Sequence, residues 1–256
     1  MSPEPVAAVT FDFWETLVRD SPDNLTRARL RRVASLTAVL ARAGSPHRVD
    51  AVEDAHDRCG TEVSARYWAE NREPSIREQV CLFLECLEAG LPGRCSAEIL
   101  DEAVEVYGGP ALEYPPELMP GAREAVQALS ARGVRLGIVS NTGRTPGIVL
   151  RRILERYDLL HHFQAIGISY SDEVGWRKPD ARIFRRTLEA LGVEPSRALH
   201  VGDNPEDDVA GARAAGMRAV HYVVTGRTPS PVADLIVAHL GDLPGRLDGL
   251  LGRRGD

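Results

Sequence analysis

The chain has 256 residues and a mass of 27.9 kDa, with a formal net charge of −6 and a sequence pI of about 5.7. This length allows one large core or a core with a smaller module, and we expect two modules. The acidic balance argues against nucleic acid or an anionic membrane surface as a partner. No apolar stretch approaches the roughly twenty residues of a membrane-spanning helix, and the first residues lack a charged secretion signal, so we expect a cytoplasmic protein.

The chain begins with an apolar run of strand length, residues 6–11, which ends at Asp12. Strand-like runs then stop, and apolar residues recur at three- and four-residue spacing. This pattern predicts helices at 25–40, 49–68, 76–87 and 99–107. We therefore expect an all-helical insertion at residues 19–114, placed directly after the first strand.

The first of these helices carries four closely spaced arginines, and another arginine follows a later strand. The first group is Arg27, Arg29, Arg31 and Arg32. We interpret it as a solvated helix face rather than a clamp for an anionic substrate. Arg144 is the better candidate for a phosphate or carboxylate contact.

From residue 115 onward the strand-like runs return, with helical patterns between them. The runs predict strands at 136–139, 163–168, 198–201 and 219–224, and the patterns predict helices at 121–132, 145–157, 180–191 and 208–215. A last apolar pattern at 233–240 is expected to finish this unit. Alternating strands and helices indicate a Rossmann-like three-layer α/β/α core with a parallel sheet, formed by residues 1–18 and 115–256.

Polar residues close several of these runs. In an open parallel sheet, ligands bind outside the carboxyl ends of the strands, so Asp12, Ser140, Asn141 and Asp203 should converge on one crevice. Lys178 should join them from a loop. Two carboxylates, one ammonium group, a hydroxyl and an amide are what metal-assisted phosphoryl transfer needs, because carboxylates hold Mg²⁺ and the cation neutralises charge in the transition state.

Lys178 is the only lysine of the chain, and the other thirty of its 31 lysine and arginine residues are arginines. The exception indicates a site that needs a compact ammonium rather than a planar guanidinium. Pro179 restricts the backbone before it and so helps to fix the approach of the lysine. His200 lies inside a predicted strand, and we expect it to be a hydrogen-bonded core histidine.

Four segments in order resemble the motifs of the haloacid dehalogenase (HAD) superfamily. They are FDFWETL at 11–17, VSN at 139–141, VGWRKPD at 174–180 and GDNPEDD at 202–208. The resemblance implies a core with a helical cap, and an aspartyl-phosphate intermediate formed on Asp12. It implies catalytic roles for Asp12, Ser140 and Lys178, and substrate contacts from Ser140, Asn141, Arg144 and Lys178. It also implies a Mg²⁺ site made by Asp12, the backbone carbonyl of Trp14, Asp203 and Asp208.

One departure from this pattern keeps alternatives open. Phosphatases of this superfamily usually carry a second aspartate two positions after the nucleophile, where it protonates the leaving group, but here that residue is Trp14. An indole does not titrate near neutrality. We nevertheless expect a Mg²⁺-dependent phosphatase acting on a small phosphorylated metabolite, because the carboxylate of Asp203 would repel a carboxylate substrate unless a cation neutralised it. The alternatives are a metal-independent 2-haloacid dehalogenase using the same aspartate, and a non-catalytic binding module.

Overall fold

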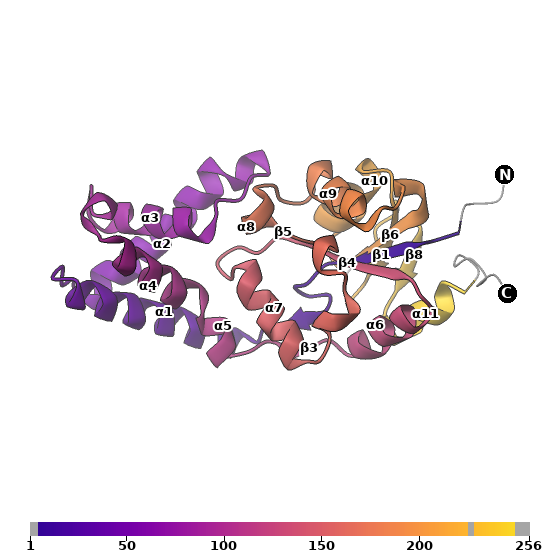
Figure 1. Cartoon of the computed structure of the whole chain (residues 1–256), viewed down its shortest axis with the longest axis horizontal. Helices are drawn as coiled ribbons and strands as arrows, with labels where there is room; N and C mark the ends of the chain where they lie inside the picture. Colours follow the sequence, from indigo (N-terminus) through magenta and orange to yellow (C-terminus); the bar gives the residue numbers. More distant parts are fainter. Residues whose placement is uncertain (1–4, 225–227, 249–256) are drawn as a thin grey trace.

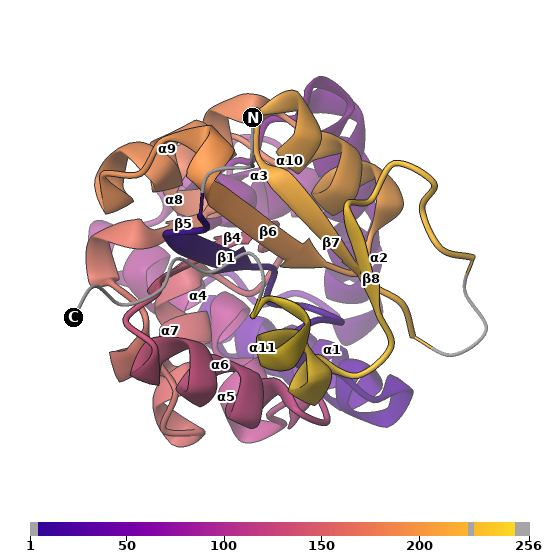
Figure 2. The same cartoon turned by 90° about the vertical axis from the view of Figure 1, so that its right-hand side faces the viewer.

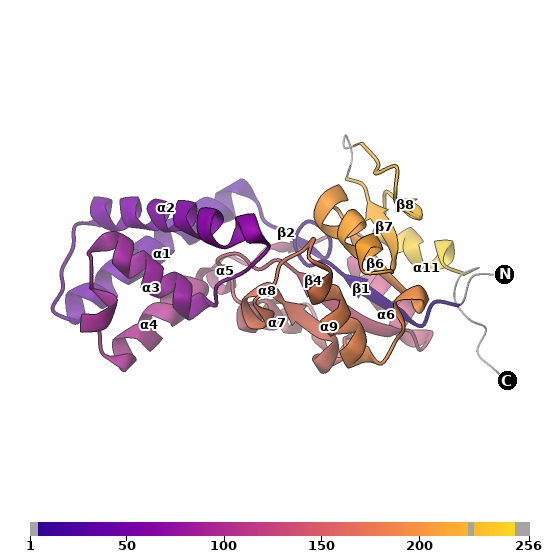
Figure 3. The same cartoon turned by 90° about the horizontal axis from the view of Figure 1, so that it is seen from above.

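The computed structural model describes residues 5–224 and 228–248. It is elongated, with a bundle of helices at one end and a sheet flanked by helices at the other (Figure 1). Viewed from above, the two parts lie end to end (Figure 3). Among the described residues, no helix combines the length and the apolar character that crossing a bilayer demands.

The larger part is built on a six-stranded sheet in which every pairing is parallel. In spatial order, its strands are β5 (Ile168–Tyr170), β4 (Arg135–Ser140), β1 (Ala8–Phe11), β6 (Ala198–Gly202), β7 (Arg218–Tyr222) and β8 (Leu235–Val237). The β1 strand is central and fully buried. The strands on both sides of β1 therefore bring their carboxyl ends to the same edge of the sheet.

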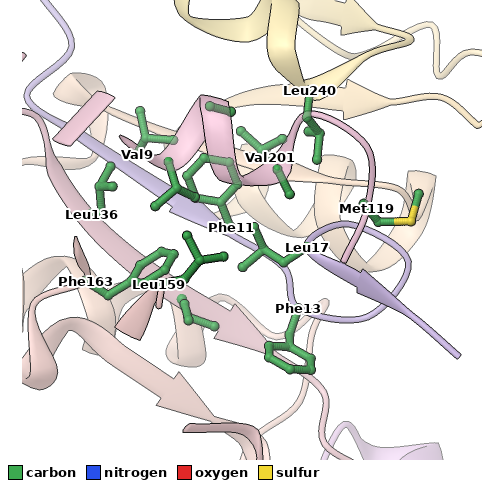
Figure 4. Close-up of a cluster of buried hydrophobic side chains, with 14 of the residues drawn as sticks. Val9, Phe11, Phe13, Leu17, Met119, Leu136, Leu159, Phe163, Val201 and Leu240 are labelled. Atoms are coloured by element: carbon green, nitrogen blue, oxygen red, sulfur yellow. The ribbon is translucent and has the colours of Figure 1, made fainter. Parts of the chain in front are cut away.

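Helices cover both faces of this sheet (Figure 2). On one face lie α6 (Ala122–Ala131), α7 (Gly147–Arg156) and α11 (Leu243–Arg246), and on the other α9 (Ala181–Leu191) and α10 (Gly211–Ala214). The first face encloses the larger apolar cluster, where Phe11, Leu136 and Phe163 pack with Val201 (Figure 4). The second face encloses a separate cluster that includes Phe184 and Val209. The predicted α/β/α architecture is confirmed.

The helical part runs from the end of β1 to the start of α6. Its helices are α1 (Pro22–Arg42), α2 (Val49–Arg66), α3 (Ile76–Leu87), α4 (Ala97–Gly108) and the single turn α5 (Pro110–Glu113). Serine side chains cap three of them at Ser21, Ser75 and Ser96, where each accepts a hydrogen bond from the first turn. Leu36, Phe83 and Tyr107 belong to the apolar cluster that these helices enclose between them.

A short antiparallel ribbon lies where the chain passes between the two parts. It consists of β2 (Val18–Arg19) and β3 (Glu117–Leu118), with Val18 opposite Leu118. The sequence pattern did not predict this ribbon, because two-residue strands leave no periodicity. The ribbon holds the outgoing and returning segments side by side.

The remaining elements are short. They are the helical turn α8 (Ser171–Val174), a π-helical segment at Pro205–Ala210, and 3₁₀ turns at Trp68–Glu70, Pro92–Arg94, Leu160–His162, Ala165–Gly167, Pro195–Arg197 and Leu240–Asp242. The predicted strand at 163–168 is wrong for most of its length, because β5 begins only at Ile168. Phe163 is buried there, but Ile166 is 65% exposed, so the run does not enter the sheet. The predicted helix at 208–215 is instead divided between the π-helical segment and α10.

Candidate active site

Three side chains meet at the carboxyl edge of the sheet. Asp12 directly follows β1, Ser140 is the last residue of β4, and Asp203 directly follows β6. Because β1 lies between β4 and β6, these positions are neighbours in space. All three residues are buried, so the polar side chains at the ends of these neighbouring strands lie inside the protein.

Lys178 enters this pocket from the loop after α8. Its Nζ lies 2.7 Å from Oδ1 of Asp12 and 2.5 Å from Oδ1 of Asp208. The side chain of Asn141 holds the lysine backbone, since its Oδ1 accepts from the N–H of Lys178 at 2.8 Å and its Nδ2 donates to the carbonyl at 3.2 Å. The structure therefore places Asn141 against the loop that carries the lysine.

Asp208 is held by a chain of buried polar groups that includes His200, and the prediction that His200 is a hydrogen-bonded core histidine is confirmed. Nε2 of His200 lies 3.1 Å from its Oδ1, and Nδ1 of the same ring lies 2.9 Å from the hydroxyl of Thr10. The N–H of Asn204 donates to Oδ2 of Asp208 at 2.9 Å. The contact between Thr10 and His200 could have been suspected, because both are polar residues and they occupy paired positions of two buried strands.

Gly202 leaves room for this arrangement. A Cβ at that position would lie 2.1 Å from Cγ of Asp208, a separation that no pair of carbon atoms tolerates without movement. The glycine at the end of β6 thus lets the Asp208 carboxylate approach the strand closely enough to contact Lys178 and His200.

Burial and charge act on these groups in opposite directions. Burial alone would lower the pKa of Lys178, but Asp12 and Asp208 outweigh it and hold the pKa above its usual range. Burial likewise opposes ionisation of Asp208, yet Lys178 and then His200 keep its pKa below the usual range. Burial raises the pKa of Asp12, although Lys178 opposes this effect. A further cation beside Asp12 would favour its charged form.

The carboxylates of Asp12, Asp203 and Asp208 form a cluster in which one oxygen of each lies within 4.8 Å of the others. Three carboxylates and one ammonium leave an excess of negative charge in a buried pocket. Hard oxygen ligands at such spacing suit Mg²⁺, which prefers carboxylates and water. The donor set present therefore fits a divalent cation.

Ser140 and Trp14 complete the predicted set around Asp12. The hydroxyl of Ser140 is buried and meets no hydrogen-bonding partner in the described part of the chain, but it lies near enough to Asp12 to help lower that pKa. Trp14 is partly buried, and its ring packs edge-on against Phe13 at 5.0 Å between centroids. No titratable group occupies that position, as the sequence indicated.

A cavity of about 450 Å³ lies between the helical part and the loops that follow β1 and β4. Trp14 and Thr142 line it, and they stand two residues after Asp12 and Ser140 respectively. Arg144 also lines it and reaches α2, where a Cβ added to Gly60 would lie 2.1 Å from Nη2. The interpretation of the α1 arginines as a solvated face is wrong for Arg32, which is only 6% exposed and lines the same cavity.

A second contact joins the two parts beside Lys178. The carboxylate of Glu73, which precedes α3, is buried and pairs with the guanidinium of Arg177. The same carboxylate accepts from Nε1 of Trp68 at 2.9 Å and from the hydroxyl of Ser171 at 3.0 Å. The guanidinium of Arg177 also lies 4.3 Å from the Trp68 ring. Sequence reasoning missed this contact, since no local pattern links residues about a hundred positions apart.

Comparison with known proteins agrees with this geometry. The family model for haloacid dehalogenase-like hydrolases matches residues 6–216. The phosphoserine phosphatase of Thermus thermophilus is 32% identical over 251 residues, which is 91% of this chain and 94% of that protein. The structure of a 2-haloacid dehalogenase from Pseudomonas syringae pv. Tomato DC3000 is 26% identical, with a TM-score of 0.67 over 94% of this chain and 98% of that one. The structure of an HAD phosphatase from Thermococcus onnurineus is 25% identical, with a TM-score of 0.61 over 95% of this chain and 99% of that one. The chain belongs to the haloacid dehalogenase-like hydrolase family.

Proposed function

We propose that this hydrolase is a Mg²⁺-dependent phosphatase that acts on a small phosphorylated metabolite through an aspartyl phosphate. The observation that carries the proposal is the contact of one buried ammonium, that of Lys178, with both Asp12 and Asp208 while Asp203 lies within ligand distance. Such a pocket is suited to a tetrahedral dianion bound through a divalent cation. The similarity to phosphatases from Thermus and Thermococcus supports this reading.

In the proposed reaction, Asp12 attacks phosphorus with the carboxylate oxygen that does not contact Lys178, and the bond to the leaving oxygen breaks. Lys178 and the Ser140 hydroxyl stabilise charge on the phosphoryl oxygens. Water then hydrolyses the aspartyl phosphate and regenerates Asp12. Asp12, Asp203 and Asp208, with the carbonyl of Trp14, would hold Mg²⁺, which supplies charge neutralisation to the phosphoryl group.

The leaving oxygen needs a proton that Trp14 does not supply. Loss of a general acid costs about 10²–10⁴ in rate, and least when the leaving group is already acidic. We therefore propose that the natural substrate has a good leaving group or that another residue lining the cavity donates the proton. Glu15 and Asp20 both line it, and burial raises the pKa of Asp20 to about 6.

We further propose that residues 19–114 form a cap and that residues 1–18 and 115–256 form the catalytic core. The helices of residues 19–114 enclose an apolar cluster of their own, which supports this division, and only Ala111 and Leu112 of that range join the cluster of the core. A cap that closes over the carboxylate pocket would exclude water and select the substrate. The four cysteines are free thiols, which supports our proposal of a cytoplasmic location, where thiols stay reduced.

The second candidate function is metal-independent dehalogenation of a 2-haloacid. Trp14 favours it, since dehalogenases of the superfamily resemble this chain in placing an aromatic residue there, and the P. syringae structure is similar overall. Asp203 opposes it, because a further buried carboxylate beside Asp12 would repel a carboxylate substrate at the reacting centre unless a cation intervened.

One assay separates the two candidates. Release of inorganic phosphate from a panel of phosphomonoesters, with and without Mg²⁺, is compared with release of halide from 2-chloropropionate in the presence of a chelator. We expect phosphate release that requires the metal, and no halide. Halide release without metal would select the dehalogenase. Inactivity in both assays would favour a binding module.

Two variants test the assigned roles on an activated aryl phosphate. Asp12→Asn should abolish turnover, and Lys178→Arg should reduce it about 10- to 100-fold, because a planar guanidinium does not reproduce one nitrogen placed between two carboxylates. Asp101→Asn, which changes a carboxylate that is 65% exposed on α4, is the control. Wild-type turnover in either test variant would contradict the role of that residue.

A further inference from the structure

Arg32 is a buried cation without a carboxylate partner. Its Nε donates to the backbone carbonyl of Tyr107 at 2.5 Å, and its guanidinium carbon lies 5.3 Å from the centre of that ring. Within the described residues, no carboxylate lies at ion-pairing distance from it. The other arginines of α1 differ, because Arg27, Arg29 and Arg31 all pair with carboxylates near the surface. The arginine that α1 turns inward is therefore the one left uncompensated.

A second guanidinium reaches the same place from the core. Arg144 follows β4 and extends across the cavity to Gly60 of α2. It too lacks an ion pair with any described carboxylate, and it lies near enough to Arg32 to help lower the pKa of that group, which burial reduces to about 10. Two like charges placed together are costly where burial limits their solvation, as it does for Arg32, unless an anion lies between or beside them.

His56 adds an unpartnered polar atom to this cavity. The ring is 3% exposed, and Nδ1 lies 3.1 Å from the Asp57 carboxylate, while Nε2 meets no partner within the described chain. Burial lowers the pKa of His56 to about 4, so the ring is neutral at pH 7. With its proton held on Nδ1 by Asp57, Nε2 is an acceptor that needs an O–H or N–H donor. No residue in the described ranges supplies that donor.

These three groups line one cavity of about 450 Å³ with Trp14 and Thr142, which stand two residues after Asp12 and Ser140 in the chain. Arg32 and His56 come from the cap, and Arg144 comes from the core. A ligand that extends from the carboxylate pocket into the cavity would therefore meet guanidinium groups from both domains.

We propose that Arg32 and Arg144 bind a carboxylate of the substrate while its phosphate lies at Asp12, and that His56 accepts a hydrogen bond from a neighbouring hydroxyl or amino group. The substrate class is then a phosphomonoester of a small hydroxy or amino acid. The inference rests on the proposed phosphatase function, and it adds a recognition site for a second anion. Guanidinium groups match carboxylates through paired hydrogen bonds, which explains why arginine occupies both positions.

The test uses two substrates that differ at one end. 3-Phosphoglycerate carries a carboxylate where glycerol 3-phosphate carries a CH₂OH group. Wild type should prefer 3-phosphoglycerate in kcat/KM, and Arg32→Gln should reduce that preference about 10- to 100-fold, as expected for a charge-assisted hydrogen bond lost from a buried site. The control is Arg27→Gln, which removes an exposed arginine of the same helix and should keep the wild-type preference.

A second measurement separates this inference from the phosphatase proposal. Binding of glycerate, with glycerol as the reference, is measured by calorimetry in wild type and in Arg32→Gln. Glycerate binding that the variant loses supports the carboxylate site even if no phosphomonoester is hydrolysed. Hydrolysis of both phosphomonoesters with equal kcat/KM, together with no glycerate binding, would overturn the carboxylate site and leave the phosphatase proposal standing. If Arg27→Gln reduced the preference for 3-phosphoglycerate as much as Arg32→Gln does, the carboxylate site would also be overturned.

Discussion

Glu73 should control how firmly the cap closes over the core. Its carboxylate is 4% exposed and accepts three hydrogen bonds, from Trp68 within the cap and from Ser171 and Arg177 of the core. The backbone adds to the contact, since the N–H of Glu73 donates to the carbonyl of Gly175 at 3.1 Å. Replacing Glu73 with glutamine keeps the shape of the side chain and removes the charge that Arg177 faces.

The size of the effect follows from this burial. A hydrogen bond to a charged group contributes about 1.5–3 kcal/mol, and breaking a fully buried ion pair costs about 3–5 kcal/mol. The Arg177 side chain remains 16% exposed, so water offsets part of this cost. We expect Glu73→Gln to weaken cap closure by about 2 kcal/mol, which corresponds to about a 30-fold shift toward an open cap.

The assay combines scattering with kinetics. In solution, Glu73→Gln should show a larger radius of gyration than wild type, and its kcat/KM should fall about 10- to 30-fold, since the same closed state must form before reaction. Glu70→Gln, an exposed glutamate three residues earlier, is the matched control. A variant at position 73 with wild-type scattering and wild-type kcat/KM would refute the idea that this contact closes the cap.

Three other predictions concern the metal, the missing acid and a buried carboxyl group. Mg²⁺ at about a hundred times its Kd should stabilise the fold by about 2–3 kcal/mol in thermal unfolding, and Asp203→Asn should lose this gain; an equal gain in the variant would place the ion elsewhere. Trp14→Asp should raise the turnover of an alkyl phosphate relative to an aryl phosphate by about 100-fold, whereas an unchanged ratio would show that another residue already donates the proton. Burial raises the pKa of Asp172 from 3.8 to about 6, so its contribution to stability is present below about pH 4 and is lost as the pH rises through about 6. In urea unfolding, Asp172→Asn should therefore gain up to about 3 kcal/mol over wild type between pH 4 and pH 7, and a pH-independent difference would contradict this.

The parts of the site that local sequence could predict are those at strand ends. Asp12, Ser140 and Asp203 each close an apolar run, and parallel pairing forces such positions together. The prediction of a strand at 163–168 was wrong, because an apolar run can indicate burial but does not show whether its backbone is hydrogen-bonded to a sheet. Phe163 is buried against the core from a 3₁₀ turn, and the sheet begins only at Ile168.

Contacts between the cap and the core lay beyond local patterns. Arg32 could have been recognised, because it stands four residues before Leu36 and eight before Leu40, both on the buried face of α1. The approach of Arg144 to Gly60 could not have been recognised from the sequence, because residues so far apart in the chain share no periodicity. Tertiary packing decides which arginine of a charged helix faces inward, and the spacing of charges alone does not.

The position of the sole lysine links catalysis to cap closure. Lys178 contacts Asp12 and Asp208 through a single nitrogen, and the residue before it, Arg177, pairs with Glu73 of the cap. Asn141 holds the backbone between these two contacts and itself follows Ser140 at the end of β4. The backbone of Lys178 is therefore tied to the end of β4, while the residue before it is tied to the cap. A guanidinium at position 178 would need to spread its nitrogens across a space in which one nitrogen contacts two carboxylates, which is why a compact ammonium suits this position.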